Sequence, residues 1–277
     1  MDLNWLQSLL YGLLSGFTEF VPVSALAHES LMLWLFGVSS QPMLQIFVKI
    51  GTLLGLMMAC RRTLAKFSRE RRLMQLPAKR RKRQPDPMVM MDKNLLKMAT
   101  IPMLLLLLLR IKTISLDHNL SLMPIFLIIN GIVLYIPDRL PVGNKDSRSL
   151  SPLDGLLMGI VAGLSAIPGI SRMGLVTTVA AARGTDRQHG LNLALLLGIP
   201  ALLMLLIFDI VNAFIIGVVG FTFLTLLQCL MAALAACLGA AMAISLLRFL
   251  AVKTGFSGFA YYSWGVALFI FIMFMTT

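Results

Sequence analysis

The sequence predicts an all-α polytopic membrane protein, and three observations point to this class. First, 58% of the 277 residues are hydrophobic and only 13% are charged, which gives a mean hydropathy of +0.87. A soluble fold of this length cannot bury so much apolar surface. Second, the apolar residues gather in runs of membrane-spanning length. Third, two similar polar strings, Gly16 to Ser24 and Gly163 to Ser171, interrupt apolar runs far apart in the chain.

Six apolar stretches are close to the length of a bilayer-spanning helix, which is about 17 to 25 residues. They are residues 43–60, 98–112, 120–137, 190–208, 219–247 and 257–275. Two further stretches, residues 3–37 and 153–184, are too long for one span and are interrupted centrally by Pro22 and by Pro168. Irregular backbone at membrane depth is tolerated only where protein or a wet cavity surrounds it. We therefore expect each interrupted stretch to form a re-entrant hairpin of two half-length helices.

Positive charge predicts the orientation of the chain. Residues 61–97 hold 13 of the 24 lysines and arginines, whereas the first 48 residues hold none. The positive-inside rule makes residues 61–97 a cytoplasmic loop, with attraction to anionic lipid headgroups and no nucleic-acid partner. Counting spans from this loop places residues 113–119 outside. The two interrupted stretches then open to opposite faces and meet tip to tip.

We expect residues 1–277 to form a single membrane domain, with a first repeat over about 1–137 and a second over about 153–277. One long span also carries two stripes of small residues at helical spacing. The stripes are Ala232, Ala236 and Ala240, and Ala235, Gly239 and Ala243. Small residues let helices approach closely. Packing inside the chain is the favoured interpretation of these stripes, and a homodimer interface is the alternative.

A set of polar side chains lies at the two interruptions. Its members are Thr18, Glu19, Ser24, His28 and Glu29 in the first stretch, and Ser171 and Arg172 in the second. An ionisable side chain within a spanning segment is a functional candidate by default, because it is costly to bury unpaired. In contrast, Asp209 falls near a predicted helix end and is expected to mark a membrane interface.

These residue types suit phosphoryl transfer. Glu19 is a candidate base or a ligand for Mg²⁺ or Ca²⁺, and His28 is a candidate proton carrier or nucleophile. Arg172, at the start of a half-helix, offers a cationic fork and free backbone N–H groups for phosphate oxygens. The alternative is that the three residues only pair with one another and hold the tips together.

The same strings resemble the signatures of the undecaprenyl-diphosphatase family of the bacitracin-resistance type. S-G-F-T-E-F-V-P-V-S-A-L-A-H, from Ser15 to His28, resembles the family's E-G-x-T-E-F-x-P-V-S-S-x-G-H. P-G-I-S-R-M-G, from Pro168 to Gly174, resembles its P-G-x-S-R-S-G. The resemblance implies hydrolysis of undecaprenyl diphosphate to the monophosphate in the inner (plasma) membrane of a bacterium, which recycles the lipid carrier of cell-wall synthesis.

The resemblance also assigns roles to individual residues. It implies catalytic roles for Glu19, His28 and Arg172, and a divalent cation, Mg²⁺ or Ca²⁺, held by Glu19. The residues expected to bind the substrate are Thr18, Ser24, Lys49, Gly169 and Ser171.

The chain departs from the family pattern at several of these positions. Ser15 stands for the first glutamate, Met173 for a serine, and Lys49 for the usual glutamine, while Ala25 and Ala27 replace a serine and a glycine. One of two carboxylates expected to hold a metal is therefore missing. Lys49 is expected to supply positive charge in its place, and the alternative is that it extends to the membrane interface.

The departures also raise a second functional hypothesis. A chain that lacks a family carboxylate and keeps the anion-holding arginine would suit a polyprenyl-phosphate transporter or a binder without catalysis.

Glu29 is a possible substitute for the missing carboxylate, but it follows His28 directly and so lies about 100° round a helix from it.

Overall fold

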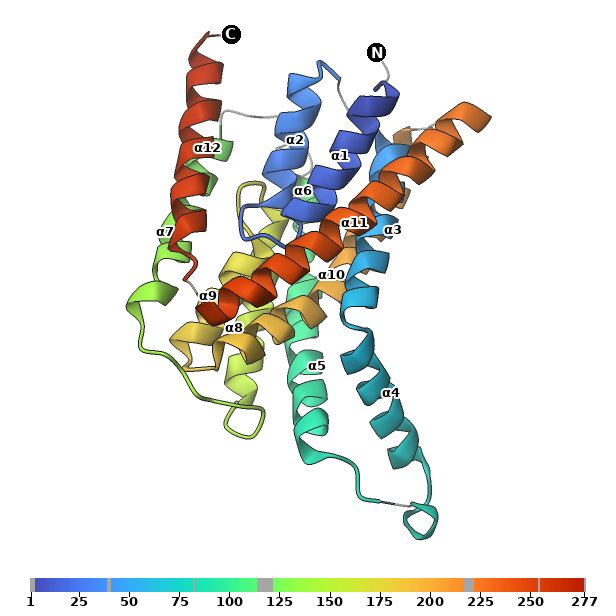
Figure 1. Cartoon of the computed structure of the whole chain (residues 1–277), viewed down its shortest axis with the longest axis vertical. Coiled ribbons are helices and arrows are strands. Elements are labelled where there is room, and N and C mark those ends of the chain that lie inside the picture. Colours follow the sequence, from blue (N-terminus) through green and yellow to red (C-terminus); the bar gives the residue numbers. More distant parts are fainter. Residues whose placement is uncertain are drawn as a thin grey trace.

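The computed structural model describes residues 3–38, 41–81, 83–113, 122–216, 222–253 and 255–276. These ranges are helical apart from their connections and a single isolated β-bridge (Figure 1). The α-helices are α1 (Trp5–Thr18), α2 (Ala25–Leu35), α3 (Pro42–Ala59), α4 (Arg61–Gln75), α5 (Pro87–Leu107), α6 (Arg110–Thr113), α7 (Met123–Tyr135), α8 (Pro152–Gly163), α9 (Arg172–Ala182), α10 (Arg187–Ile216), α11 (Phe223–Lys253) and α12 (Ser257–Thr276). Most of the predicted outer loop, residues 113–119, lies outside the described ranges.

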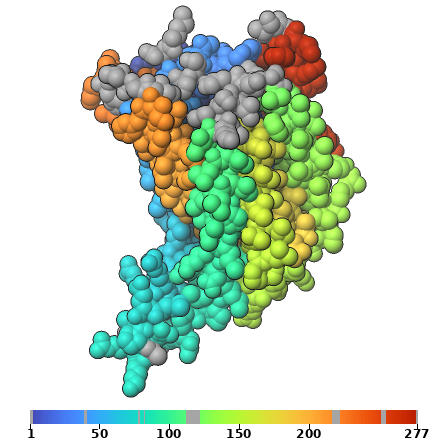
Figure 2. Space-filling model, turned by 180° about the vertical axis from the view of Figure 1, so that it is seen from behind, coloured from blue at the N-terminus to red at the C-terminus, as the bar shows by residue number. Residues whose placement is uncertain are grey.

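Four described helices are long and apolar enough to cross a membrane, namely α3, α10, α11 and α12. The fold class is therefore confirmed at the level of an all-helical membrane protein. The start of α1 and the end of α12 lie at one end of the molecule, and the α4–α5 hairpin projects from the opposite end (Figures 1 and 2).

Both predicted interruptions are present. The first separates α1 from α2, and the second separates α8 and its short 3₁₀ extension (Leu164–Ala166) from α9. Ser24 in the first break has a backbone φ of 68°, and Gly169 in the second has a φ of 100°. A side chain at Gly169 would also meet Cβ of Phe126 at 2.4 Å. This turn therefore requires glycine, both for its dihedral angles and for its space.

The small-residue stripes of α11 pack within the chain. Their backbone lies against glycines of α1 and α3, since an added Cβ at Gly12, Gly16 or Gly51 would stand 2.0–2.2 Å from a carbonyl oxygen of α11. Such close approach lets backbone and small side chains supply the packing between helices. Internal packing was the favoured interpretation of these stripes, and it is confirmed.

The basic region 61–97, predicted as a loop, is mostly helical. It forms α4, a short 3₁₀ turn and the first half of α5, so the basic connection between the two neighbouring spans is built largely from helix. The connection is held by Glu70, which accepts hydrogen bonds from the guanidinium of Arg83 and from the backbone N–H of Asp86 at 3.0 Å. These two donors hold the pKa of the Glu70 carboxyl below its usual value. Patterning by charge alone predicted the side of the membrane but not this local structure.

The contact between α1 and α11 gives a test of the fold. In Gly16→Ala the new Cβ would stand 2.1 Å from the carbonyl oxygen of Ala236, so the two helices must separate. We expect a loss of about 1–3 kcal/mol in stability, seen as a lower thermal midpoint in detergent. The control is Gly265→Ala in α12, where an added Cβ meets nothing within 4 Å. Equal midpoints for the two variants would contradict the packing.

Candidate active site at the junction of the two interrupted helices

The two helix breaks touch each other deep in the molecule. The Ser24 hydroxyl accepts a hydrogen bond of 3.0 Å from the backbone N–H of Gly169, and both residues are buried. The positive φ of Ser24 is uncommon for a residue with a side chain. A strained backbone persists only where its surroundings fix it. The predicted contact between the two breaks is therefore confirmed.

Asn130 of α7 joins the same two breaks from the side. Its amide nitrogen donates to the carbonyl of Pro22 and to the hydroxyl of Ser263, each at 3.2 Å, and its amide oxygen accepts from the N–H of Ser171 at 2.9 Å. The side chain is only 1% exposed. One amide thus satisfies backbone groups from both breaks. The sequence analysis missed this residue, although a lone asparagine in an apolar run is a recognisable signal.

Glu19 and Arg172 form an ion pair across the junction. A guanidinium nitrogen of Arg172 lies 2.8 Å from a carboxylate oxygen of Glu19, and the two side chains are 4% and 13% exposed. The Nε of Arg172 is buried and has no hydrogen-bond partner within the part of the chain that the structure describes. The site therefore holds a cationic donor that no described residue satisfies.

Helix α9 begins at this point. Ser171 caps it, because its hydroxyl accepts from the N–H of Gly174 at 3.2 Å. The N–H groups of the first helical turn and the positive end of the helix dipole face the junction together with the side chain of Arg172. This combination favours an anion with several oxygens, such as a phosphate group.

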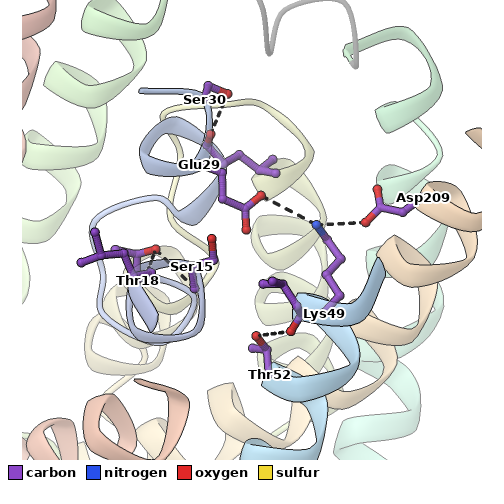
Figure 3. Close-up of polar contacts among 10 residues, drawn as sticks. Ser15, Thr18, Glu29, Ser30, Lys49, Thr52 and Asp209 are labelled. Carbon is purple, nitrogen blue, oxygen red and sulfur yellow. Dashed lines mark hydrogen bonds and ion pairs between the residues drawn. The ribbon is translucent and has the colours of Figure 1, made fainter. Parts of the chain in front are cut away.

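Lys49 occupies a separate cluster nearer the end where α1 starts. Its ammonium lies 3.0 Å from Asp209 and 3.7 Å from Glu29, and Figure 3 shows the three side chains pointing toward one another from α3, α10 and α2. The Lys49 side chain is only 9% exposed, so the alternative of a lysine that extends to the interface was wrong. Asp209, expected to mark a membrane interface, is a largely buried partner of Lys49, and α10 continues beyond it to Ile216.

His28 lies on the other side of the junction, against α12. Its Nδ1 lies 2.8 Å from the carbonyl oxygen of Ser24, and its Nε2 lies 2.9 Å from the Tyr262 hydroxyl. A carbonyl only accepts, so Nδ1 carries the proton in the neutral ring and Nε2 accepts from Tyr262. The two rings also stack, with centroids 5.7 Å apart. The structure therefore pairs His28 with Tyr262, a residue the sequence analysis did not assign to the site.

His28 and Thr18 line a lateral cavity of about 700 Å³ between α1, α2, α11 and α12. Most of its wall is apolar and includes Phe17, Leu31 and Phe259. The size and lining suit part of a hydrocarbon chain. The cavity begins beside the junction, since Thr18 precedes Glu19 directly in the chain.

The predicted site residues thus fall into three neighbouring groups. Glu19, Ser24, Gly169, Ser171 and Arg172 meet at the junction, Thr18 and His28 line the lateral cavity, and Lys49 lies in the carboxylate cluster.

The donor set does not fit the expected divalent cation. No group of three metal-binding side chains occurs among the described residues, and each nearby carboxylate already faces a cation. Glu19 faces Arg172, while Glu29 and Asp209 face Lys49. Ser15, at the family's glutamate position, is buried with an unpartnered hydroxyl. A hard divalent cation prefers several free oxygen ligands, and the described carboxylates do not offer such a set.

The fold and the site together define a helical membrane protein in which a buried arginine at a helix start lies beside a mostly apolar cavity. A family model described as bacitracin resistance protein BacA matches residues 8–269. The chain belongs to this family.

Individual relatives agree with this assignment. The chain is 30% identical over 212 residues to an undecaprenyl-diphosphatase of Nocardioides sp., covering 75% of each chain. It is 28% identical over 274 residues to an undecaprenyl-diphosphatase of Carboxydothermus hydrogenoformans, covering 98% of each chain. A protein of Methanobrevibacter smithii with the same name is 28% identical over 273 residues, covering 96% of each chain.

The role of Asn130 gives the prediction of this section. Asn130→Leu keeps an apolar core but leaves the N–H of Ser171 and the carbonyl of Pro22 without their partner. Each buried group left unpaired costs about 1–3 kcal/mol, so we expect a loss of about 2–5 kcal/mol in the free energy of unfolding. The control, Ser263→Ala, removes one bond only and should cost about 1 kcal/mol. Thermal unfolding in detergent measures both, and equal losses would contradict a joining role for Asn130.

Proposed function

We propose that this protein hydrolyses undecaprenyl diphosphate to the monophosphate and inorganic phosphate at the junction of the two helix breaks. The observation that carries the proposal is the buried, partly unsatisfied Arg172 at the start of α9, opposite Glu19. Family membership and the shared name of the relatives support the same reaction. That name also favours a hydrolase over a transporter or a binder without catalysis.

Substrate binding begins with Arg172. The Nε and the first-turn N–H groups of α9 hold oxygens of the diphosphate, and Ser171 keeps that helix end in place. The phosphate oxygens compete with Glu19 for the guanidinium, since both are anions that favour a fork of N–H donors. Exchange of Glu19 for phosphate frees the carboxylate beside the terminal phosphorus. Thr18 and the lateral cavity hold the first units of the prenyl tail.

Hydrolysis then follows by proton transfer. Glu19 accepts a proton from a water molecule while the oxygen of that water attacks the terminal phosphorus. The bond from this phosphorus to the bridging oxygen then breaks. Arg172 stabilises the charge that develops on the phosphoryl oxygens. The monophosphate leaves with the bridging oxygen and its electron pair, and the second proton of the water stays on the released phosphate. His28, whose Nδ1 donates to the Ser24 carbonyl, is the proton carrier because its Nε2 can accept the proton from Glu19 and pass it to solvent.

The membrane arrangement completes the proposal. Six crossings and two re-entrant hairpins place the basic α4–α5 end in the cytoplasm of a bacterial cell and the Lys49 cluster toward the outer face. This orientation follows the distribution of lysine and arginine. The active site then opens outward, and the prenyl tail reaches the bilayer through the lateral cavity.

Phosphate release by the purified protein tests the reaction. We expect wild type to release phosphate from a prenyl diphosphate in detergent. Arg172→Gln should lower kcat/KM by about 10²–10³-fold, because it removes the donor to the developing charge. The matched control is Arg183→Gln, at the far end of α9, where the arginine pairs with Asp154 instead. Absence of release by well-folded wild type, or equal losses in both variants, would overturn the proposal.

The Lys49 cluster gives a second test. Because an ammonium already holds Glu29 and Asp209, wild-type activity and thermal midpoint should change little with EDTA. Lys49→Gln removes the ammonium that faces Glu29 and Asp209, which creates an oxygen-rich site for Mg²⁺. We expect this variant to lose stability and to regain part of it with added Mg²⁺.

The control for the Lys49 test is the double variant Lys49→Gln with Asp209→Asn, which removes one of the two carboxylates. Its midpoint should respond less to Mg²⁺ than that of the single variant. Abolition of wild-type activity by EDTA, together with an unchanged Lys49→Gln variant, would show that Lys49 does not replace a metal.

A further inference from the structure

A second groove lies near the basic end of the molecule, apart from the junction. It has a volume of about 560 Å³ and runs between α4, α5 and α10. Leu64 and Phe67 of α4 and Ile199 of α10 give it apolar walls, and Lys93, Lys97 and Thr100 line it from α5.

The charge in this groove is concentrated at one end. Lys93 and Lys97 are four residues apart on α5 and so lie on one face of the helix. No carboxylate is within ion-pair distance of either lysine among the described residues. The neighbouring acid, Asp92, lies 3.3 Å from His189 of α10 instead. The groove therefore combines an apolar trough with two ammonium groups that no carboxylate of the described residues neutralises.

We propose that this groove binds an anionic phospholipid of the leaflet next to the basic end. One acyl chain lies against Leu64, Phe67 and Ile199, and the phosphate contacts Lys93 and Lys97. Basic pockets between spanning helices suit anionic headgroups in this way. The charge also excludes a second copy of the same face, which would place lysines against lysines. The binding is independent of the proposed hydrolysis, since the groove shares no lining residue with the lateral cavity.

Native mass spectrometry of the purified full chain in detergent tests the proposal, with phosphatidylglycerol and phosphatidylcholine of identical acyl chains as probes. We expect wild type to bind phosphatidylglycerol at least about tenfold more tightly than phosphatidylcholine, because two basic residues contact its headgroup. The double variant Lys93→Gln, Lys97→Gln should lose most of this preference. The matched control is Arg71→Gln, Arg72→Gln, which removes the same charge from exposed positions of α4 outside the groove.

A third variant tests the apolar trough. Thr100→Trp fills the groove while keeping both lysines, and it should weaken binding of both lipids. Its control is Ile128→Trp, at an exposed position of α7. The absence of a phosphatidylglycerol preference in wild type, or equal losses in the lysine and arginine variants, would show only general attraction to the basic end and would overturn the site. Unchanged binding by Thr100→Trp would overturn the acyl-chain contact.

Discussion

Backbone groups freed by a broken helix must find partners inside the protein, because a hydrocarbon surrounding offers none. The two breaks in this chain supply many of these hydrogen-bond partners to each other. The Ser24 hydroxyl accepts a hydrogen bond from the N–H of Gly169. The Asn130 side chain hydrogen-bonds one backbone group from each break. The positions of Glu19 and Arg172 follow from this joint, since each lies at the edge of one break. The ion pair between Glu19 and Arg172 can form only when the two breaks lie against each other.

The sequence was sufficient to predict features that depend on local cost. Proline, glycine and serine within apolar runs indicated both breaks, because such residues are expensive in a continuous membrane helix. Small residues at helical spacing indicated the close packing of α11. The charged residues beside the breaks indicated the Glu19–Arg172 site. In each case a residue is unfavourable in an apolar helix, and its neighbours in the sequence indicate the structure that offsets this cost.

Features that depend on a distant partner could not be predicted in the same way. Asp209 reads as an interfacial residue until Lys49 is seen beside it, and 160 positions separate the two in the chain. Tyr262 and His28 are still farther apart in sequence. The basic region 61–97 shows the opposite limit: its charge predicted a side of the membrane, but its helices depend on local contacts such as Glu70 with Arg83.

The charge balance of the site sets a condition on the proposed binding of a diphosphate head group. Glu19 neutralises Arg172 while the site is empty, and the Lys49 cluster carries two carboxylates for one ammonium. The described charged groups of the site therefore carry no net positive charge before the substrate binds. Binding must replace a carboxylate on Arg172 rather than add to it, and removing one partner from a buried pair is costly unless another anion takes its place. In the proposed reaction this exchange couples recognition to catalysis, because the phosphate that displaces Glu19 also brings the released carboxylate close to the attacking water.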